Sequence, residues 1–259
     1  MSPSIKLRVP AANGLLSAIL SAIPPSELPG VWPSLERVSL SAGEELFVRE
    51  SRIDDVYFPI DCVVSFLYAT ADGSTVAMGM TGNEGMVGLA ALLSGSRTPG
   101  RAVVQISGDA WKMNAHTLRD RFARGGLFQQ LLLTYAQVLL TQISQTAVCN
   151  RFHSLEMRFS LWLLLCQDRL DSDVLRMTQD SIAGSLGGRR ESVTFAARRL
   201  KAAGLICYSR GHIKILDRLG LESAVCECYR AVTEEEGRLR GFYTTFKAAR
   251  AETQFAAAC

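Results

Sequence analysis

The stretch from Thr178 to Ile206 reads TQDSIAGSLGGRRESVTFAARRLKAAGLI, and it decides the fold of the C-terminal part of the chain. Thr178 is a favourable N-cap for a first helix, which Gly187 and Gly188 end. A second helix follows, beginning near Arg189 and ending at Gly204. Two helices joined by a short turn that contains glycine predict a helix-turn-helix.

The segment after this pair of helices predicts a β-hairpin. LICYS and HIKIL alternate like short strands, and Arg210-Gly211 joins them, which completes a winged helix-turn-helix. Basic residues outnumber acidic ones by nine to five between positions 171 and 218, whereas the whole chain has a formal net charge of only +3. Positive charge is therefore concentrated in the predicted winged domain.

The start of the second helix carries side chains that can read bases. In a helix-turn-helix this helix enters the major groove, and its N-terminal residues face the base edges. Arg190 can donate two hydrogen bonds to guanine, and Glu191 can accept one from cytosine. The alternative is an ordinary solvated helix start, but the preceding helix, the glycine turn and the hairpin favour DNA reading. We expect DNA contacts from Thr178, Gln179, Arg189, Arg190, Glu191, Ser192, Thr194, Phe195, Arg198, Arg210, His212 and Lys214.

Residues 34 to about 115 predict an antiparallel β-roll. The candidate strands are SLERVSL, EELFV, VYFPI, CVVSFLYAT, STVAMGM and RAVVQISGDAWKM. Within this segment Gly79, Gly82, Gly85 and Gly88 recur at every third position. Such glycines either permit tight turns or cradle an anion with backbone N–H groups, and the turn interpretation is favoured because no basic residue accompanies them.

A helix of about 25 residues is predicted from near Leu127 to Arg151. It carries two adjacent apolar stripes, which need two partners. We expect one stripe to cover the roll and the other to meet the same helix of a second subunit; burial of both within one large monomer is the alternative. The predicted dimer interface comprises Phe128, Leu131, Leu132, Tyr135, Val138, Leu139, Gln142 and Thr146.

The remaining segments suggest neither a membrane span nor a metal site. The apolar run at 15–23 is far shorter than the roughly 20 residues that cross a bilayer, so it predicts a short amphipathic helix. Seven scattered cysteines without a secretory leader predict reduced cytosolic thiols. Cys226 and Cys228 form the one close pair, and without a second pair at comparable spacing we expect no metal. His116, His153 and His212 are interpreted as surface or hydrogen-bonded groups.

From about position 13 to 216 the chain resembles the Crp/Fnr transcription regulators. The resemblance rests mainly on the 178–206 stretch, and more weakly on YFPIDCVVSFL and GNEGMVGLAALLSG. It implies an α+β fold with an N-terminal antiparallel β-roll or jelly roll of the cyclic-nucleotide-binding type, a long dimerisation helix and a C-terminal winged helix-turn-helix. The expected divisions are 1–125 for the sensor, 126–170 for the dimerisation and connecting helices, 171–218 for the DNA-binding domain and 219–259 for a helical extension.

The resemblance also exposes departures at both sites. Where the family's recognition helix carries a further arginine, this chain has Phe195, which either touches a thymine methyl or turns inward and leaves Thr194 to make the contact. Where cyclic-AMP-responsive relatives carry a Gly-Glu pair, this chain has Gly88 followed by Leu89. We therefore expect no conventional cyclic AMP response, and the effector stays unidentified. The candidate effector pocket is Gly85, Gly88, Leu89, Arg97, Thr98 and Arg101.

The expected function is that of a cytoplasmic, homodimeric transcription regulator that binds near-palindromic double-stranded DNA and contacts RNA polymerase. No catalytic residues are expected, because the chain has no G-x-S-x-G, H-E-x-x-H or P-loop motif. The alternative is a small-molecule-binding cytosolic sensor or enzyme whose winged domain binds protein. The extension after position 218 predicts one or two helices that contact the wing, the roll or polymerase.

Overall fold

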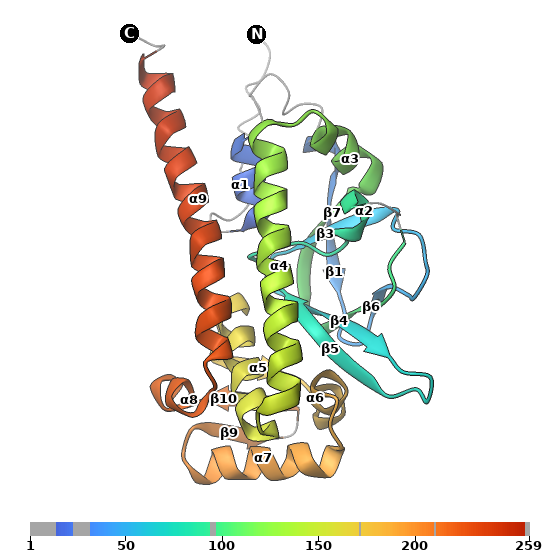
Figure 1. Cartoon of the computed structure of the whole chain (residues 1–259), viewed down its shortest axis with the longest axis vertical. Helices are drawn as coiled ribbons and strands as arrows, with labels where there is room; N and C mark the ends of the chain where they lie inside the picture. Colours follow the sequence, from blue (N-terminus) through green and yellow to red (C-terminus); the bar gives the residue numbers. More distant parts are fainter. Residues whose placement is uncertain (1–13, 23–31, 94–96, 171, 210, 257–259) are drawn as a thin grey trace.

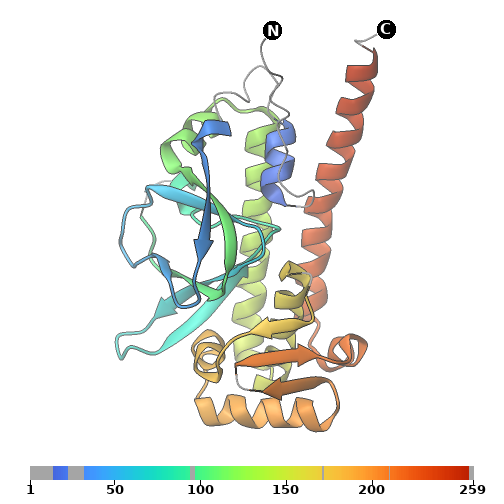
Figure 2. The ribbon, with the colours of Figure 1, turned by 180° about the vertical axis from the view of Figure 1, so that it is seen from behind.

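The computed structural model describes residues 14–22, 32–93, 97–170, 172–209 and 211–256. In these ranges a β-roll lies beside a long helix, and a small winged domain lies across one end of that helix (Figures 1 and 2). The helices are α1 (Leu15–Ala22), the 3-10 helix η2 (Trp32–Ser34), α2 (Ala90–Leu93), α3 (Ala115–Ala123), α4 (Gly126–Phe152), α5 (Leu155–Leu170), α6 (Gln179–Leu186), α7 (Arg190–Ala202), α8 (Arg218–Ala224) and α9 (Cys228–Ala256). The strands are β1 (Leu35–Leu40), β2 (Glu45–Phe47), β3 (Asp55–Pro59), β4 (Val63–Ala69), β5 (Thr75–Thr81), β6 (Arg101–Ile106), β7 (Gly108–Asn114), β8 (Val174–Arg176), β9 (Ile206–Ser209) and β10 (His212–Ile215). The predicted fold class is confirmed.

The roll consists of two antiparallel sheets, with strand orders β1-β7-β3 and β2-β6-β4-β5. The stretch RAVVQISGDAWKM, predicted as one strand, forms two: β6 belongs to one sheet and β7 to the other. The chain changes sheets at Ser107, between the end of β6 and Gly108. The backbone N–H of the next residue, Asp109, donates a hydrogen bond to the Asp61 carboxylate at 2.6 Å. Only Ser107 separates the two segments, so their sequence pattern does not reveal this crossing.

The glycine repeat lies where helices press against the roll. A Cβ atom on Gly82 would lie only 2.6 Å from the Cβ of Arg169 on α5, so no larger residue fits there without movement. The Gly82 N–H donates to the Glu84 carboxylate at 3.0 Å. The backbone of this loop thus binds the carboxylate of Glu84, a residue of the loop itself. Its glycines allow helices to approach closely, in addition to permitting turns.

Helix α4 is the axis of the molecule. Its apolar residues join the core of the roll on one side, and α9 runs along it on another (Figure 1). The predicted short helix α1 also packs against α4, and Leu15, Leu16, Ile19 and Leu20 are buried in the same core. None of the described helices combines the length and the apolar character that crossing a membrane requires.

The winged domain is built from α6, α7 and a three-stranded sheet of order β8-β10-β9. The predicted helices, hairpin and glycine positions are all confirmed, with Gly211 in the turn at φ 75° and Arg210 outside the described residues. Strand β8 adds an edge that the sequence analysis missed, because Val174–Arg176 is too short to show a period. The extension forms α8 and α9, of which α9 contacts α4 and α5.

Candidate nucleic-acid interface

Helix α7 lies across the end of the molecule, on the side away from the roll (Figure 1). Its inner face packs against α5 and α6, where Val193, Ala196, Ala197 and Leu200 are buried. Helix α6, which precedes it, packs against β5 of the roll. This arrangement leaves the outer face of α7 uncovered by the rest of the described chain.

The turn between the two helices depends on local capping and on one glycine. The Thr178 hydroxyl accepts a hydrogen bond from the Ser181 N–H at 3.1 Å and starts α6 as predicted. Gly187 ends α6 in the left-handed conformation, at φ 58° and ψ 35°. A Cβ there would also lie 2.9 Å from Val76 on β5, so both the backbone and the packing require glycine.

The side chains predicted to read bases lie at the N-terminal end of α7, on its outer face. Arg189, Arg190, Glu191 and Ser192 are all exposed. The Arg190 Nε lies 3.4 Å from an oxygen of Asp180, and the two side chains are 63% and 69% exposed. An ion pair so open to water contributes little stability, so Arg190 can exchange this partner for a base or a phosphate at small cost.

The next turn of α7 resolves the two interpretations of Phe195. Its ring is 62% exposed and points outward. Thr194 instead turns toward the domain, where its hydroxyl lies 3.0 Å from the Gln179 Oε1 and 2.9 Å from the Arg190 carbonyl oxygen. Phe195 therefore lies on the outer face of α7, followed one turn later by the exposed Arg198.

The wing also exposes polar side chains, one of them basic. Along β10, His212 and Lys214 are exposed, whereas Ile213 and Ile215 are buried in the domain core. This alternation directs both polar side chains to the solvent face, as a strand requires. The outer face of α7 and β10 thus each expose basic side chains, and Phe195 adds an apolar ring to the face of α7. Such side chains suit a polyanion that also presents methyl groups.

Residues 158–224 match the family model of the Crp-like helix-turn-helix domain. The chain carries a Crp-like helix-turn-helix domain. The match begins within α5 and ends with α8, so it includes both helices of the motif and the wing. No curated protein matches the chain in a sequence comparison.

Solved structures extend the likeness to the whole architecture. FixK2 from Bradyrhizobium japonicum has 17% identity and a TM-score of 0.64, with 74% of this chain and 98% of that chain covered. A transcriptional regulator of the CRP family from Thermus thermophilus has 17% identity and a TM-score of 0.61, covering 73% and 95%. A CRP/FNR family regulator from the same organism has 20% identity and a TM-score of 0.56, covering 73% and 97%. The Crp-like domain thus sits on the fold of the Crp/Fnr regulators.

The predicted effector residues that the structure describes are engaged in different contacts of the roll. Leu89 is 8% exposed and belongs to the core of the roll, and a Cβ on Gly88 would lie 2.9 Å from Val56. Arg101 forms an ion pair with Glu45 on β2. Arg97 lies in a β-bridge with Arg52, and the Thr98 hydroxyl bonds to the Gly100 carbonyl at 3.2 Å.

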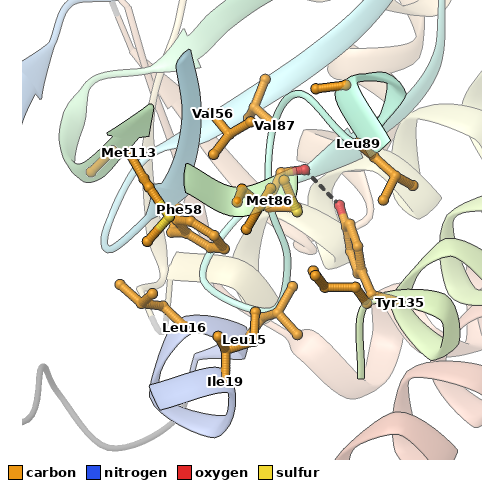
Figure 3. Close-up of a cluster of buried hydrophobic side chains, with 14 of the residues drawn as sticks. Leu15, Leu16, Ile19, Val56, Phe58, Met86, Val87, Leu89, Met113 and Tyr135 are labelled. Carbon is orange, nitrogen blue, oxygen red and sulfur yellow. Dashed lines mark hydrogen bonds between the residues drawn. The ribbon is translucent and has the colours of Figure 1, made fainter. Parts of the chain in front are cut away.

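The space next to Gly85 is filled by Tyr135 of α4. Its hydroxyl donates to the Met86 carbonyl at 2.9 Å and lies 3.1 Å from the Thr81 hydroxyl, as Figure 3 shows for the Met86 bond. Burial, followed by the nearby Glu84 charge, raises the pKa of Tyr135 well above its usual value, so the phenol stays protonated. Tyr135 thus seals the roll against α4 with a satisfied polar group.

Below this contact, Arg169 joins three parts of the chain. Its Nε lies 2.9 Å from Glu84 in the roll, and its Nη2 lies 2.6 Å from Glu236 on α9. Burial alone would lower the pKa of Arg169, but the two carboxylates outweigh this effect and raise it. Burial raises the pKa of Glu236, an effect that the neighbouring Arg169 opposes. Roll, α5 and α9 are thereby held at one buried point.

Most of the predicted dimer residues are used within one chain. Phe128, Leu131, Leu132, Tyr135 and Val138 are buried in the core cluster of the roll, and Leu139 packs against its edge. Gln142 is buried as well, with its Oε1 accepting from the Met80 N–H at 2.8 Å, and Thr146 is half-buried. The expectation that these side chains face a second subunit is therefore corrected for the six buried ones, because the roll, α1 and α9 cover them within one chain. For the half-buried Leu139 and Thr146 it stays a prediction.

A different stripe of α4 is exposed. Leu133 is 48% exposed and Leu140 is 59% exposed, and Ala147 follows at the same spacing of seven. The half-buried Ile143 lies between Leu140 and Ala147. This seven-residue repeat was visible in the sequence, but the longer run of large apolar residues on the buried faces obscured it.

Proposed function

We propose that this chain is a sequence-specific DNA-binding transcription regulator that acts as a homodimer on near-palindromic operators. The outer face of α7 carries this proposal, because it combines Arg190, Glu191 and Phe195 at an end of the molecule that the roll leaves uncovered. The Crp-like domain and the fold of its structural neighbours support it. Its DNA target places such a regulator in the cytoplasm, where it contacts RNA polymerase.

The exposed stripe of α4 supports the proposed dimer. Leu133, Leu140 and Ala147 recur every seven residues, which is the repeat by which two parallel helices supercoil around each other. A twofold axis along α4 would place both copies of α7 at the same end of the dimer. Two such helices read half-sites about one helical turn apart, roughly 10 to 11 base pairs from centre to centre.

The packed roll supports the proposal that cyclic AMP is not the effector. Leu89 stands where an acidic ribose ligand is expected, and Arg101 is already paired with Glu45. Ligands of this kind need pockets of about 300 Å³ or more. To bind here, a nucleotide would therefore have to displace Tyr135 and open the buried contacts around it. DNA binding by this chain should therefore not require cyclic AMP.

Selection of binding sites from a random duplex library tests the DNA proposal. Full-length protein should enrich a near-palindromic motif with two half-sites about 10 to 11 base pairs apart. The selection is run with and without cyclic AMP, and the same motif should emerge from both. Enrichment of no motif, together with binding to mixed DNA that lacks a steep salt dependence, would instead favour a winged domain that recognises protein.

Light scattering on two matched variants tests the dimer. Leu140→Glu places a charge in the exposed stripe of α4 and should convert dimers to monomers at micromolar concentration. Leu219→Glu, on α8, is the control, because Leu219 is even more exposed at 74% but lies off the stripe. A wild-type monomer, or equal behaviour of the two variants, would refute the proposed interface.

A further inference from the structure

Three cysteines and one histidine converge where α4 ends and α9 begins. Cys149 lies in the last turn of α4, and His153 is the C-cap of that helix. Cys226 lies in the link between α8 and α9, and Cys228 is the first residue of α9. Although 77 residues separate Cys149 from Cys226, the four ligand atoms all lie within 4.8 Å of one another.

The spacing of these atoms fits a single tetrahedral metal ion. The Cys149 and Cys226 Sγ atoms are 3.6 Å apart, and the Cys228 Sγ lies 3.6 Å from the His153 Nδ1. With Zn–S near 2.3 Å and Zn–N near 2.0 Å, neighbouring ligands of a tetrahedral zinc are about 3.5 to 3.8 Å apart. A cluster of several irons would need its thiolates further apart, since irons and sulfides lie between them.

The surroundings of His153 also suit a metal ligand. With Nδ1 directed at the cysteines, its other ring nitrogen, Nε2, lies 3.4 Å from a carboxylate oxygen of Glu227. Metal-bound histidines commonly donate their second ring N–H to a carboxylate, which fixes the tautomer and the ring orientation. Glu227 stands between the two cysteines in sequence, so the same short link supplies two ligands and this support.

We propose that Cys149, His153, Cys226 and Cys228 bind one zinc ion in a closed, structural site. Thiolate and imidazole ligands favour zinc over magnesium or calcium, which prefer oxygen. The three cysteines are at most 5% exposed, so four protein ligands fill the coordination sphere and shield the ion from solvent. The close pair Cys226 and Cys228 thus has a second ligand pair, Cys149 and His153, which lie one helical turn apart at the end of α4. The sequence pattern alone did not reveal this second pair.

The site would fasten both ends of the winged domain to one point. The matched domain, residues 158–224, lies wholly between the two ligand pairs. One ion would therefore tie the end of α4 to the start of α9 and close the loop that contains α5 to α8. Ions that bind only the folded chain stabilise it by mass action, so zinc should hold α9 in place beside α4.

Elemental analysis of full-length protein, purified without metal-affinity steps or chelators, tests the proposal. About one zinc ion per chain is expected. Replacement by cobalt(II) should give the visible spectrum of tetrahedral coordination, with a thiolate charge-transfer band. Chelation should lower the thermal midpoint, and added zinc should restore it. Protein that contains no zinc and takes none up in a titration would overturn the proposal, as would a multi-iron chromophore or a Cys149–Cys226 disulfide in protein kept under mildly reducing conditions throughout purification.

Variants of the four residues assign the ligands. The double variant C226S/C228S and His153→Ala should each lose stoichiometric zinc, whereas His153→Cys should retain it, because four thiolates also form a zinc site. Cys207→Ser is the matched control, since Cys207 is exposed on β9 and should not matter. Glu227→Ala should keep the zinc but weaken its affinity about 10-fold. Should a ligand variant fail to fold, the chelation and zinc recovery of wild-type protein decide the outcome. Unchanged zinc in folded C226S/C228S would refute the site.

Discussion

Arginines serve two opposite purposes in two regions of this molecule. At the junction of the roll, α5 and α9, Arg169 is 2% exposed and bonds to two carboxylates from distant segments. On the outer face of α7, Arg190 is 63% exposed and reaches one carboxylate at 3.4 Å. Breaking the first set of contacts leaves buried charges without a partner, whereas breaking the second leaves charges in water. Burial thus separates an arginine that holds the fold from one available to a ligand.

The largest expected effect comes from removing the buried arginine. Arg169→Ala leaves Glu84 and Glu236 without their main partner, and it should lower the free energy of unfolding by about 3 to 5 kcal/mol. Denaturant titration followed by circular dichroism measures the loss. Arg240→Ala is the control: Arg240 is 63% exposed and lies 3.7 Å from Glu236, so its loss should cost less than about 1 kcal/mol. Similar values for both variants would erase the distinction drawn between the two regions.

The exposed arginine should show the reverse pattern. Arg190→Ala should leave the unfolding midpoint unchanged, but it should weaken binding to the selected operator by about 1 to 3 kcal/mol and relax the preference at one base pair in each half-site. Titration against operators with single base changes measures both quantities. If the ranking of those operators survives the substitution, Arg190 is not a base reader.

Phe195 tests whether the apolar part of the same face contributes. Its ring is exposed in the free protein, so Phe195→Ala should not destabilise the fold. Loss of contact with a thymine methyl should weaken operator binding by about 1 kcal/mol, at a position where thymine is preferred. Substituting uracil for that thymine should produce the same loss in wild-type protein and no further loss in the variant. A loss that is independent of the methyl group would contradict this contact.

The smallest effect is expected at the wing. Lys214→Ala removes a charge that faces solvent on β10, and it should weaken binding to all sequences about equally. The slope of log affinity against log salt should become shallower by roughly one unit, the share of one phosphate contact. A change in sequence preference, measured with the operators used for Arg190, would place Lys214 among the base readers instead.

Local signals made the winged domain predictable. Thr178 and Gly187 act on their own neighbours, so the helix boundaries follow from nearby residues. The buried junction depends on residues far apart in sequence: Arg169 is 85 residues from Glu84 and 67 from Glu236. No periodic pattern in the sequence predicts that these three residues meet. Nor does one predict the contact between Cys149 and Cys226, which are 77 residues apart. The faces of α4 were misassigned because their apolar pattern identifies what is buried but not which partner buries it.

The contact between α6 and the roll includes polar groups as well as buried apolar side chains. The Ser181 and Ser185 hydroxyls lie 2.6 and 3.1 Å from the Gln105 Oε1 on β6, and Gly187 lies against β5. Helix α6 is part of the helix-turn-helix, so a change in its position would also change the affinity of the chain for DNA. A molecule that binds the roll more tightly in one of two positions of α6 would then be linked to DNA: each ligand changes the affinity of the chain for the other by the same factor. Operator DNA is therefore a screening reagent: compounds whose binding changes when the operator is present are those to which the regulator responds.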